Sequence, residues 1–280
     1  MESFSLKKKI ENISDQPELV DMVNKSLISL KKQNFDIDNH IAKVAICIDL
    51  SGSMHQLLRS GSVSEIIKRA LAQGIIFDDD GEIDVFGFGN DAKYFGTTNA
   101  KEFASFAESF RKTETLGITN YAKAIDLISN HYEDDGFDYP SYVIFVTDGD
   151  ASDKPEARNA IKRVSKMPIF FQFVAIGLCD YDPNEKKEEK KEEKPKGFLS
   201  RLFSGSSEET DSSDKNFQLV QSRFGFLLEL DDMKGRFIDN AGFFAVKEPN
   251  KMKPERMFEL LNTEYPEWYK EAKSRKMFTK

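Results

Sequence analysis

Two uninterrupted apolar runs, each leading into an aspartate, constrain the fold of this 280-residue chain more than any other feature. Residues 44–48 end at Asp49, and residues 142–146 continue through Thr147 to Asp148. Apolar runs without polar alternation are typical of parallel strands that helices cover on both faces. We therefore predict an α/β fold: a Rossmann-like, doubly wound, mostly parallel sheet with helices on both faces.

The rest of the chain supplies further elements for such a sheet. Residues 83–88 and 92–95 look like a strand hairpin, which predicts one antiparallel edge strand. Two more strands are expected, at 169–176 and 242–246. Apolar residues at helical spacing predict helices at 18–33, 64–73, 101–111, 154–166, 224–232, 254–261 and 268–276, and one that follows Asn120, whose side chain can cap it.

Oxygen-bearing side chains follow the strand ends. In open α/β sheets, ligands bind outside the carboxyl ends of the strands. In the Asp-x-Ser-x-Ser loop, alternate side chains can point inward while Gly52 lets the backbone bend. Such hard oxygen ligands favour Mg²⁺, Mn²⁺ or Ca²⁺ over zinc or copper. The residues that could converge on one cation are Asp49, Ser51, Ser53, Thr119 and Asp148.

The charge of this set suggests a use for the cation. Two carboxylates and three hydroxyls do not surround a divalent ion with anions, so water or an incoming ligand must complete the shell. We therefore hypothesise that the metal captures an acidic side chain or terminal carboxylate of a partner. His55 could contact that ligand, although a solvated or capping histidine is more common. The possible ligand-contacting rim is Gly52, Met54, His55, Asn120, Gly149 and Asp150.

A simpler interpretation exists for the first loop. Ser and Asp are favoured at helix starts because they hydrogen-bond free backbone N–H groups, so Asp-x-Ser-x-Ser alone could be a polar capping turn. The suitable positions of Thr119 and the Thr147–Gly149 loop, in a βαβ-like order, favour the metal site.

These pieces resemble the metal-ion-dependent adhesion site (MIDAS) of von Willebrand factor A (VWA) domains. The resemblance covers residues 49–54 (Asp-Leu-Ser-Gly-Ser-Met), Thr119 and 147–149 (Thr-Asp-Gly), with every ligand position filled, and extends over about residues 42 to 280. It implies a Rossmann-like sheet with the metal at its top. It also implies that the two serines bind the metal directly, that Thr119 does so when ligand is engaged, and that the aspartates act partly through waters.

The flanks are most similar to the bacterial cytoplasmic subgroup of tellurium-resistance (Ter-type) stress-response proteins. The similar segments are residues 23–30, residues 235–241 and the closing Tyr-Pro-Glu-Trp at 265–268. This resemblance implies a protein-interaction adapter that assembles with companion metal-binding Ter-type stress proteins rather than an enzyme.

Two other function classes remain open. A magnesium-dependent enzyme for phosphoryl transfer or hydrolysis would also place its metal at a strand end. Against this, Ser51 stands where a haloacid-dehalogenase-type phosphatase has its second aspartate, and the chain lacks a Gly-x-x-x-x-Gly-Lys-Ser/Thr loop. Catalysis is therefore disfavoured. The remaining class is a metal-free structural scaffold.

Composition limits the partners and the compartment. The net charge is −8 and no basic helix or stripe occurs, which argues against nucleic acid as the main partner. No signal peptide is recognisable, and no apolar stretch of about 18 residues could span a bilayer, so we expect a cytoplasmic protein without a transmembrane segment. The two cysteines, Cys47 and Cys179, look like core residues rather than a disulfide pair.

The domain organisation follows from the same patterns. We expect residues 1–40 to form a helical extension packed on one VWA domain spanning 41–280. Residues 185–216 are rich in charged and small residues and predict a disordered insertion. Within it, an apolar island could fold back on the domain or act as a docking motif for a partner or membrane surface: Phe198, Leu199, Leu202 and Phe203.

Overall fold

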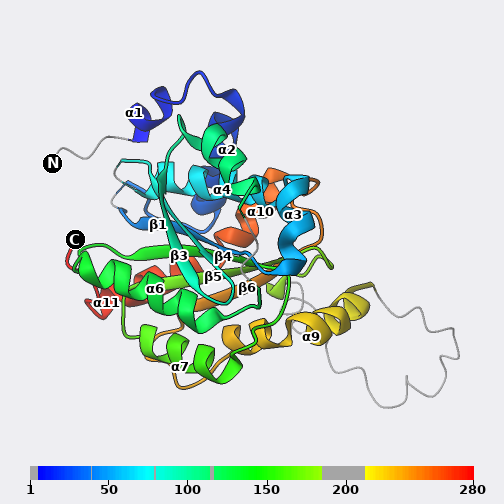
Figure 1. Ribbon diagram of the computed structural model, residues 1–280. Helices are drawn as coiled ribbons and strands as arrows, with labels where there is room; N and C mark the ends of the chain where they lie inside the picture. The colour runs from blue at the N-terminus through cyan, green and yellow to red at the C-terminus, as the bar shows by residue number, and fades with distance from the viewer. Residues whose placement is uncertain (1–5, 39, 79, 114–116, 185–211) are drawn as a thin grey trace, which may run out of the picture.

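The computed structural model describes residues 6–38, 40–78, 80–113, 117–184 and 212–280. Six strands within these residues form one sheet in the order β3-β2-β1-β4-β5-β6 (Figure 1). All neighbours pair in parallel except β2 and β3, which are antiparallel. This confirms the predicted fold class. The strands are β1 (Lys43–Asp49), β2 (Ile83–Phe88), β3 (Ala92–Thr98), β4 (Ser141–Thr147), β5 (Ile169–Ile176) and β6 (Ala241–Val246).

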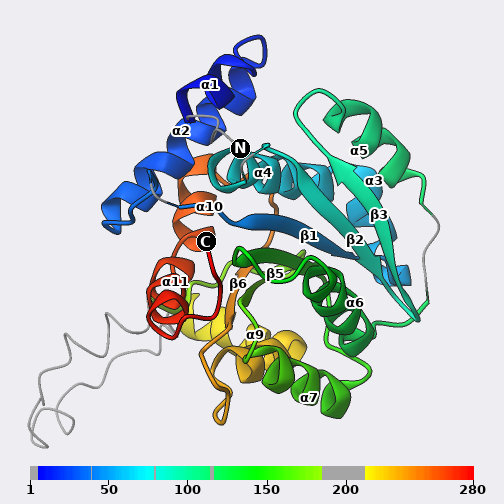
Figure 2. The ribbon, with the colours of Figure 1, turned by 90° about the vertical axis from the view of Figure 1, so that its left-hand side faces the viewer.

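Helices cover both faces of the sheet (Figure 2). On one face lie α2 (Pro17–Lys32), α4 (Ser62–Phe77), α10 (Pro254–Leu261) and α11 (Tyr265–Ser274). On the other lie α6 (Tyr121–Asp134), α7 (Lys154–Val164) and α9 (Ser212–Asp231). The remaining helices are α1 (Leu6–Glu11), a 3-10 turn (Gly52–Met54), α3 (His55–Ser60) and α5 (Phe103–Arg111).

The apolar run of β1 is explained by these two layers. Val44, Ile46 and Ile48 join the core on the α4 side, while Ala45 and Cys47 join the core on the α6 side. Successive side chains of a strand point to opposite faces, so a strand buried on both sides must be apolar throughout. Both cysteines are free and buried, as expected.

The N-terminal helix α2 packs against α4 and α10. Val23 and Leu30 are buried in the core that α4 and α10 share. The hydroxyl of Ser29 donates to the carbonyl of Phe258 at 3.0 Å. Residues at the two ends of the domain therefore lie side by side.

The charged insertion is only partly described. Its predicted disorder over 185–211 and the docking residues Phe198, Leu199, Leu202 and Phe203 lie outside the described residues. The prediction of disorder for 212–216 was wrong, because α9 begins at Ser212. The helix predicted at 224–232 corresponds to the second half of α9, which follows a kink at Phe224. Val220, Phe224 and Leu227 are buried at helical spacing, so the apolar face that stabilises α9 begins upstream of the predicted start.

Across the described ranges, none of the helices has the length and apolarity that crossing a bilayer requires.

A buried histidine lies where the N-terminal segment meets the domain. His40 packs edge-on against the rings of Phe35, Phe77, Tyr265 and Tyr269. Its Nε2 lies 3.2 Å from the Tyr265 hydroxyl. Burial lowers the pKa of His40 from 6.5 to about 3, so the imidazole stays neutral in the folded protein.

This burial predicts a pH-dependent stability. Below the unfolded-state pKa only the unfolded chain takes up the proton, so the free energy of unfolding falls as pH falls below 6.5. Between pH 7.5 and 5.0 His40 contributes a loss of about 2 kcal/mol, which His40→Gln removes. Urea titrations of both proteins at the two pH values measure the difference, and equal losses would contradict the assignment.

His131 provides a control of opposite sign. The Asp84 carboxylate, 3.6 Å from Nε2 of His131, raises the pKa of His131. The contribution of this pair to stability is therefore present at acid pH and lost as pH rises. His131→Gln should therefore increase the loss of stability on acidification.

Candidate metal centre

The centre of the site is a buried contact between the ends of β1 and β4. These strands are parallel neighbours, with Ile48 opposite Val146, so Asp49 and Thr147 follow at the same edge of the sheet. Asp49 Oδ2 accepts a hydrogen bond from the Thr147 hydroxyl at 2.7 Å. Its Oδ1 accepts one from the backbone N–H of Ser51 at 2.7 Å. The carboxylate of Asp49 is thereby held in one orientation beneath the loops.

A chain of side-chain contacts then joins the two loops. The hydroxyls of Ser51 and Ser53 lie 3.2 Å apart. Ser53 donates to Asp148 Oδ1 at 2.8 Å. Four of the five predicted ligands, Asp49, Ser51, Ser53 and Asp148, are therefore brought together above the carboxyl ends of β1 and β4.

The fifth residue, Thr119, lies on a loop that the backbone ties to both of the others. Gly52 N–H donates to the Gly117 carbonyl at 3.3 Å, and Ser152 N–H donates to the Thr119 carbonyl at 2.8 Å. Gly117 has φ of +84°, and a Cβ there would lie 2.6 Å from the Asn90 side chain. Glycine is therefore required at this turn. Thr119 is half-buried. Its backbone contact with Ser152 places it beside the loop that carries Asp148.

Burial perturbs both carboxylates. Desolvation raises the pKa of Asp49 to about 6, and the negative charge of Asp148 adds to the rise, while hydrogen bonds from Thr147 and Ser51 oppose it. Burial also raises the pKa of Asp148, against the Ser53 hydrogen bond and the positive charge of Arg223. The folded protein thus keeps two acids close together at a cost in free energy that a bound cation would offset.

The donor set fits a hard divalent cation. Within the described ranges, no cluster of three or more His, Cys, Asp or Glu is present that could hold a metal without hydroxyl ligands. The converging groups are instead carboxylates and hydroxyls, which suit magnesium, manganese or calcium.

The residues of the predicted ligand-contacting rim differ in exposure. Gly52 and His55 are exposed, while Asn120, Gly149 and Asp150 are half-buried. Met54 was wrongly placed on the rim. Its side chain is fully buried in the apolar core, because the 3-10 turn directs it under the loop.

The helix that follows Thr119 is capped by a different residue from the one predicted. The Asp153 carboxylate accepts hydrogen bonds from the N–H groups of Tyr121 and Ala122 at 2.9 and 2.8 Å. Asn120 instead donates through Nδ2 to the Asn90 carbonyl at 3.0 Å. A residue at the start of α7 thus caps α6, which local sequence patterns do not indicate.

The supporting roles of three further residues, Thr147, Asn90 and Tyr121, were not predicted from the sequence. Thr147 orients Asp49, and Asn90 Oδ1 accepts the N–H of Ile118 at 2.9 Å. The Tyr121 hydroxyl donates to the Gly149 carbonyl at 2.6 Å. Thr147 was recognised as part of the Thr-Asp-Gly loop but not as the donor to Asp49, and the roles of Asn90 and Tyr121 depend on contacts distant in sequence.

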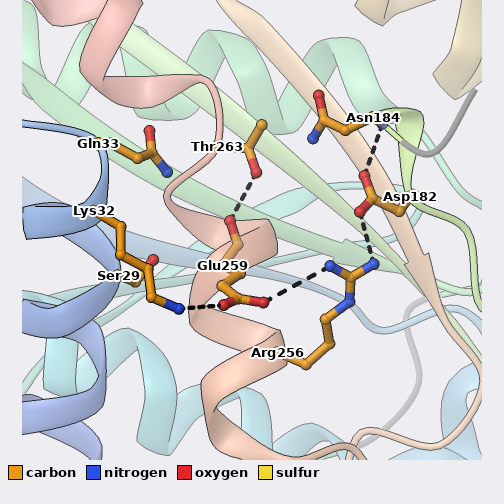
Figure 3. A pocket seen from close by; sticks show the side chains of 8 residues that line it. All are labelled: Ser29, Lys32, Gln33, Asp182, Asn184, Arg256, Glu259 and Thr263. Carbon is orange, nitrogen blue, oxygen red and sulfur yellow. Dashed lines mark hydrogen bonds and ion pairs between the residues drawn. The ribbon is translucent and has the colours of Figure 1, made fainter. Parts of the chain in front are cut away.

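A polar cleft of about 480 Å³ lies away from this centre, between α2, α10 and the segment after β5 (Figure 3). Arg256 pairs with Asp182 at 2.7 Å, and Lys32 pairs with Glu259 at 2.9 Å. The charged side chains that line the cleft thus neutralise one another.

Comparison with known proteins identifies the family. Residues 41–190 and 216–278 match the family model vWA-TerF-like, described as the vWA found in the TerF C terminus. The match covers most of the chain, so the protein belongs to this family of VWA domains.

A relative of nearly the same length comes from Bacillus subtilis. The uncharacterized protein YcbR is 24% identical over 262 residues, which cover 91% of this chain and 88% of YcbR.

Solved VWA structures are more distant. The von Willebrand factor type A protein from Catenulispora acidiphila has a TM-score of 0.45 at 14% identity over 80% of this chain, which spans only 43% of that protein. Manganese-loaded TRAP from Plasmodium vivax has a TM-score of 0.38 at 17% identity, covering 49% of this chain and 57% of TRAP. Mussel byssus PTMP1, with a zinc-occupied MIDAS motif, has a TM-score of 0.36 at 14% identity, covering 49% of this chain and 39% of PTMP1. None of these likenesses assigns a ligand to this chain.

The hydrogen bond from Thr147 to Asp49 predicts a site-specific stability effect. Thr147→Val leaves a buried carboxylate oxygen without this donor and should lower the free energy of unfolding by about 1–3 kcal/mol in metal-free buffer. Thr98→Val is the matched control, because the Thr98 hydroxyl at the end of β3 is buried with no partner in the described structure. Thr98→Val should be neutral or stabilising. Urea unfolding measures both, and a Thr147 variant no weaker than the Thr98 variant would contradict the assignment.

Proposed function

We propose that this protein is a divalent-metal-dependent interaction module whose metal captures an acidic group of a partner protein. The observation that carries the proposal is the chain of contacts from Thr147 through Asp49 and Ser51 to Ser53 and Asp148. It holds oxygen ligands from two loops in place before any cation arrives. A preorganised set of this kind lowers the cost of binding a metal.

The residues that would hold the metal are Asp49, Ser51, Ser53, Thr119 and Asp148. Magnesium is the proposed cation, because all of these ligands are oxygens and only two carry charge. When bound, the ion supplies a Lewis-acidic position that accepts a carboxylate. The two aspartate carboxylates together neutralise the charge of the divalent ion. A captured carboxylate would therefore give the complex a net charge of about −1.

The neighbouring carboxylate on the β4 loop is already paired, which favours a binding role over catalysis. A catalytic acid or base must reach the reacting group with a suitable proton affinity. Asp150, the nearest additional carboxylate along the β4 loop, pairs with Lys154 at 2.7 Å and accepts the N–H of Phe226 at 3.3 Å. It is therefore engaged in holding the loop. We propose that the protein is not an enzyme.

The family description supports a role close to that of TerF. We propose that the partners are companion Ter-type stress proteins, and that the module works in a cytoplasmic stress-response or tellurium-resistance complex. The acidic net charge of −8 disfavours nucleic acid as the competing partner.

Metal binding predicts a ligand-dependent thermal stability. Millimolar Mg²⁺ or Mn²⁺ should raise the melting temperature of the protein, because a ligand that binds only the folded state stabilises it. Asp148→Ala should remove this rise and still fold, since Asp148 lies on a loop above the core.

Asp91→Ala is the matched control for this experiment. Asp91 is a highly exposed carboxylate on the β2–β3 turn that pairs with Lys123 at 2.7 Å. Its loss should leave the metal response unchanged. A wild-type protein without any metal-dependent rise, or an Asp148 variant that responds like wild type, would refute the metal site.

Adapter function predicts metal-dependent recovery of a protein partner. Wild-type protein immobilised in Mg²⁺ should retain a partner from a lysate of its source cells, and EDTA should release it. Asp148→Ala should retain none, whereas Asp91→Ala should retain the same amount as wild type. Retention that is indifferent to EDTA would show that the metal does not mediate the contact.

A further inference from the structure

Helix α9 is kinked beside the metal centre, and the kink is held by the β4 loop. Phe224 has non-helical angles of φ −127° and ψ 23°. Two residues later, the N–H of Phe226 donates to Asp150 Oδ1 at 3.3 Å. Asp150 follows the proposed ligand Asp148 by two residues, so the ligand loop and the second half of α9 are directly connected.

Cationic side chains of α7 strengthen this connection. Lys154 pairs with Asp150 at 2.7 Å, and its Nζ lies 5.6 Å from the centre of the Phe226 ring. The Arg158 guanidinium lies 5.1 Å from the same ring. Phe226 itself is buried. The kink therefore has a defined position relative to the metal site.

Arg223 directly precedes the kink and is exposed. It stands three residues before Phe226, whose N–H donates to Asp150 on the loop that carries Asp148. In keeping with this position, its positive charge lowers the pKa of the Asp148 carboxyl against the effect of burial. Other basic residues near the site are engaged: Lys154 with Asp150, and Lys123 with Asp91 at 2.7 Å. Within the described part of the chain, Arg223 forms no ion pair of its own. Its guanidinium is thus available to an incoming anion.

Exposed apolar side chains accompany Arg223. Leu219, one turn earlier on the same face of α9, is 43% exposed, and Ile118, adjacent to Thr119, is 56% exposed. Residues four apart lie on one face of a helix, so Leu219 and Arg223 present a joint surface. Large exposed apolar side chains next to a polar site are common where a protein partner binds.

We propose that Arg223 is a ligand-contacting residue of this site, which pairs with the acidic group that the metal captures and so selects carboxylates over neutral oxygen ligands. The inference rests on the proposed metal-dependent function. One divalent ion and two aspartates sum to zero charge, and the captured carboxylate then leaves one negative charge that Arg223 balances. Guanidinium groups suit this role because they bind carboxylates through two parallel N–H donors. The partner that fits is an acidic residue flanked by apolar ones.

The test uses two peptides immobilised through their amino ends and amidated at their carboxyl ends, Gly-Gly-Leu-Asp-Leu-Gly-Gly and the same peptide with Asn in place of Asp, in Mn²⁺ and in EDTA. Wild-type protein should bind the Asp peptide in Mn²⁺ more tightly than the Asn peptide. Arg223→Gln should weaken binding of the Asp peptide by about fivefold, as expected for an exposed ion pair of about 1 kcal/mol, without weakening the Asn peptide. Arg223→Glu should weaken the Asp peptide further.

Lys166→Gln is the matched control, because it removes the same charge from an exposed residue that precedes the amino end of β5, at the opposite edge of the sheet. It should bind both peptides like wild type. Mn²⁺-dependent thermal stabilisation of the Arg223 variants should be retained or increased, since a positive charge near the cation is removed.

The two proposals fail in different ways. A wild-type protein that Mn²⁺ stabilises, but that binds the Asp peptide no better than the Asn peptide, overturns the role of Arg223 and leaves the metal site standing. The same conclusion follows if Arg223→Gln binds the Asp peptide like Lys166→Gln. Absence of Mn²⁺ stabilisation in wild type overturns the metal site and the Arg223 proposal with it.

Discussion

The parallel pairing of β1 with β4 at the middle of the sheet is the constraint on which the site depends. It puts Asp49 and Thr147 side by side at the carboxyl edge, where the threonine hydroxyl donates to the buried carboxylate at 2.7 Å. Both strands are buried on both faces, so their ends cannot shift without disturbing two apolar cores. The strands position Asp49, the first proposed ligand, and the loops above them carry the other proposed ligands.

Two buried carboxylates lower the stability of the folded protein, and the proposed cation would offset this cost. Burial raises the pKa values of Asp49 and Asp148, which means that the folded state disfavours their ionised forms. Natural proteins commonly keep such unfavourable groups where a ligand will use them. A bound cation would offset the unfavourable burial of these two negative charges. The positive charge of Arg223 on α9 partly offsets it for Asp148. The contact between Phe226 and Asp150 fixes the second half of α9 beside the loop that carries Asp148.

Much of the fold could be predicted because hydrophobic periodicity is a local signal. The runs that became β1, β4 and β5, and the hairpin of β2 and β3, were recognised close to their observed bounds. Errors arose where the outcome depended on distant contacts. Helix α9 starts at Ser212 rather than within the predicted segment, since Val220 finds a buried position against the domain. Asp153 rather than Asn120 caps α6, because α7 packs beside it.

The identity of the proposed ligands and their hard-oxygen chemistry could be worked out from the chain alone, since they depend on residue types at the ends of apolar runs. Their convergence could be expected because parallel strands end at one edge of a sheet. The contact that joins the two loops, the hydrogen bond from Ser53 to Asp148, was decided by the order of the strands in the sheet. The tertiary structure also decided the burial of Met54 and the effect of Arg223 on the pKa of Asp148. Side-chain direction and long-range charge interactions arise from packing in three dimensions, and no local pattern encodes them.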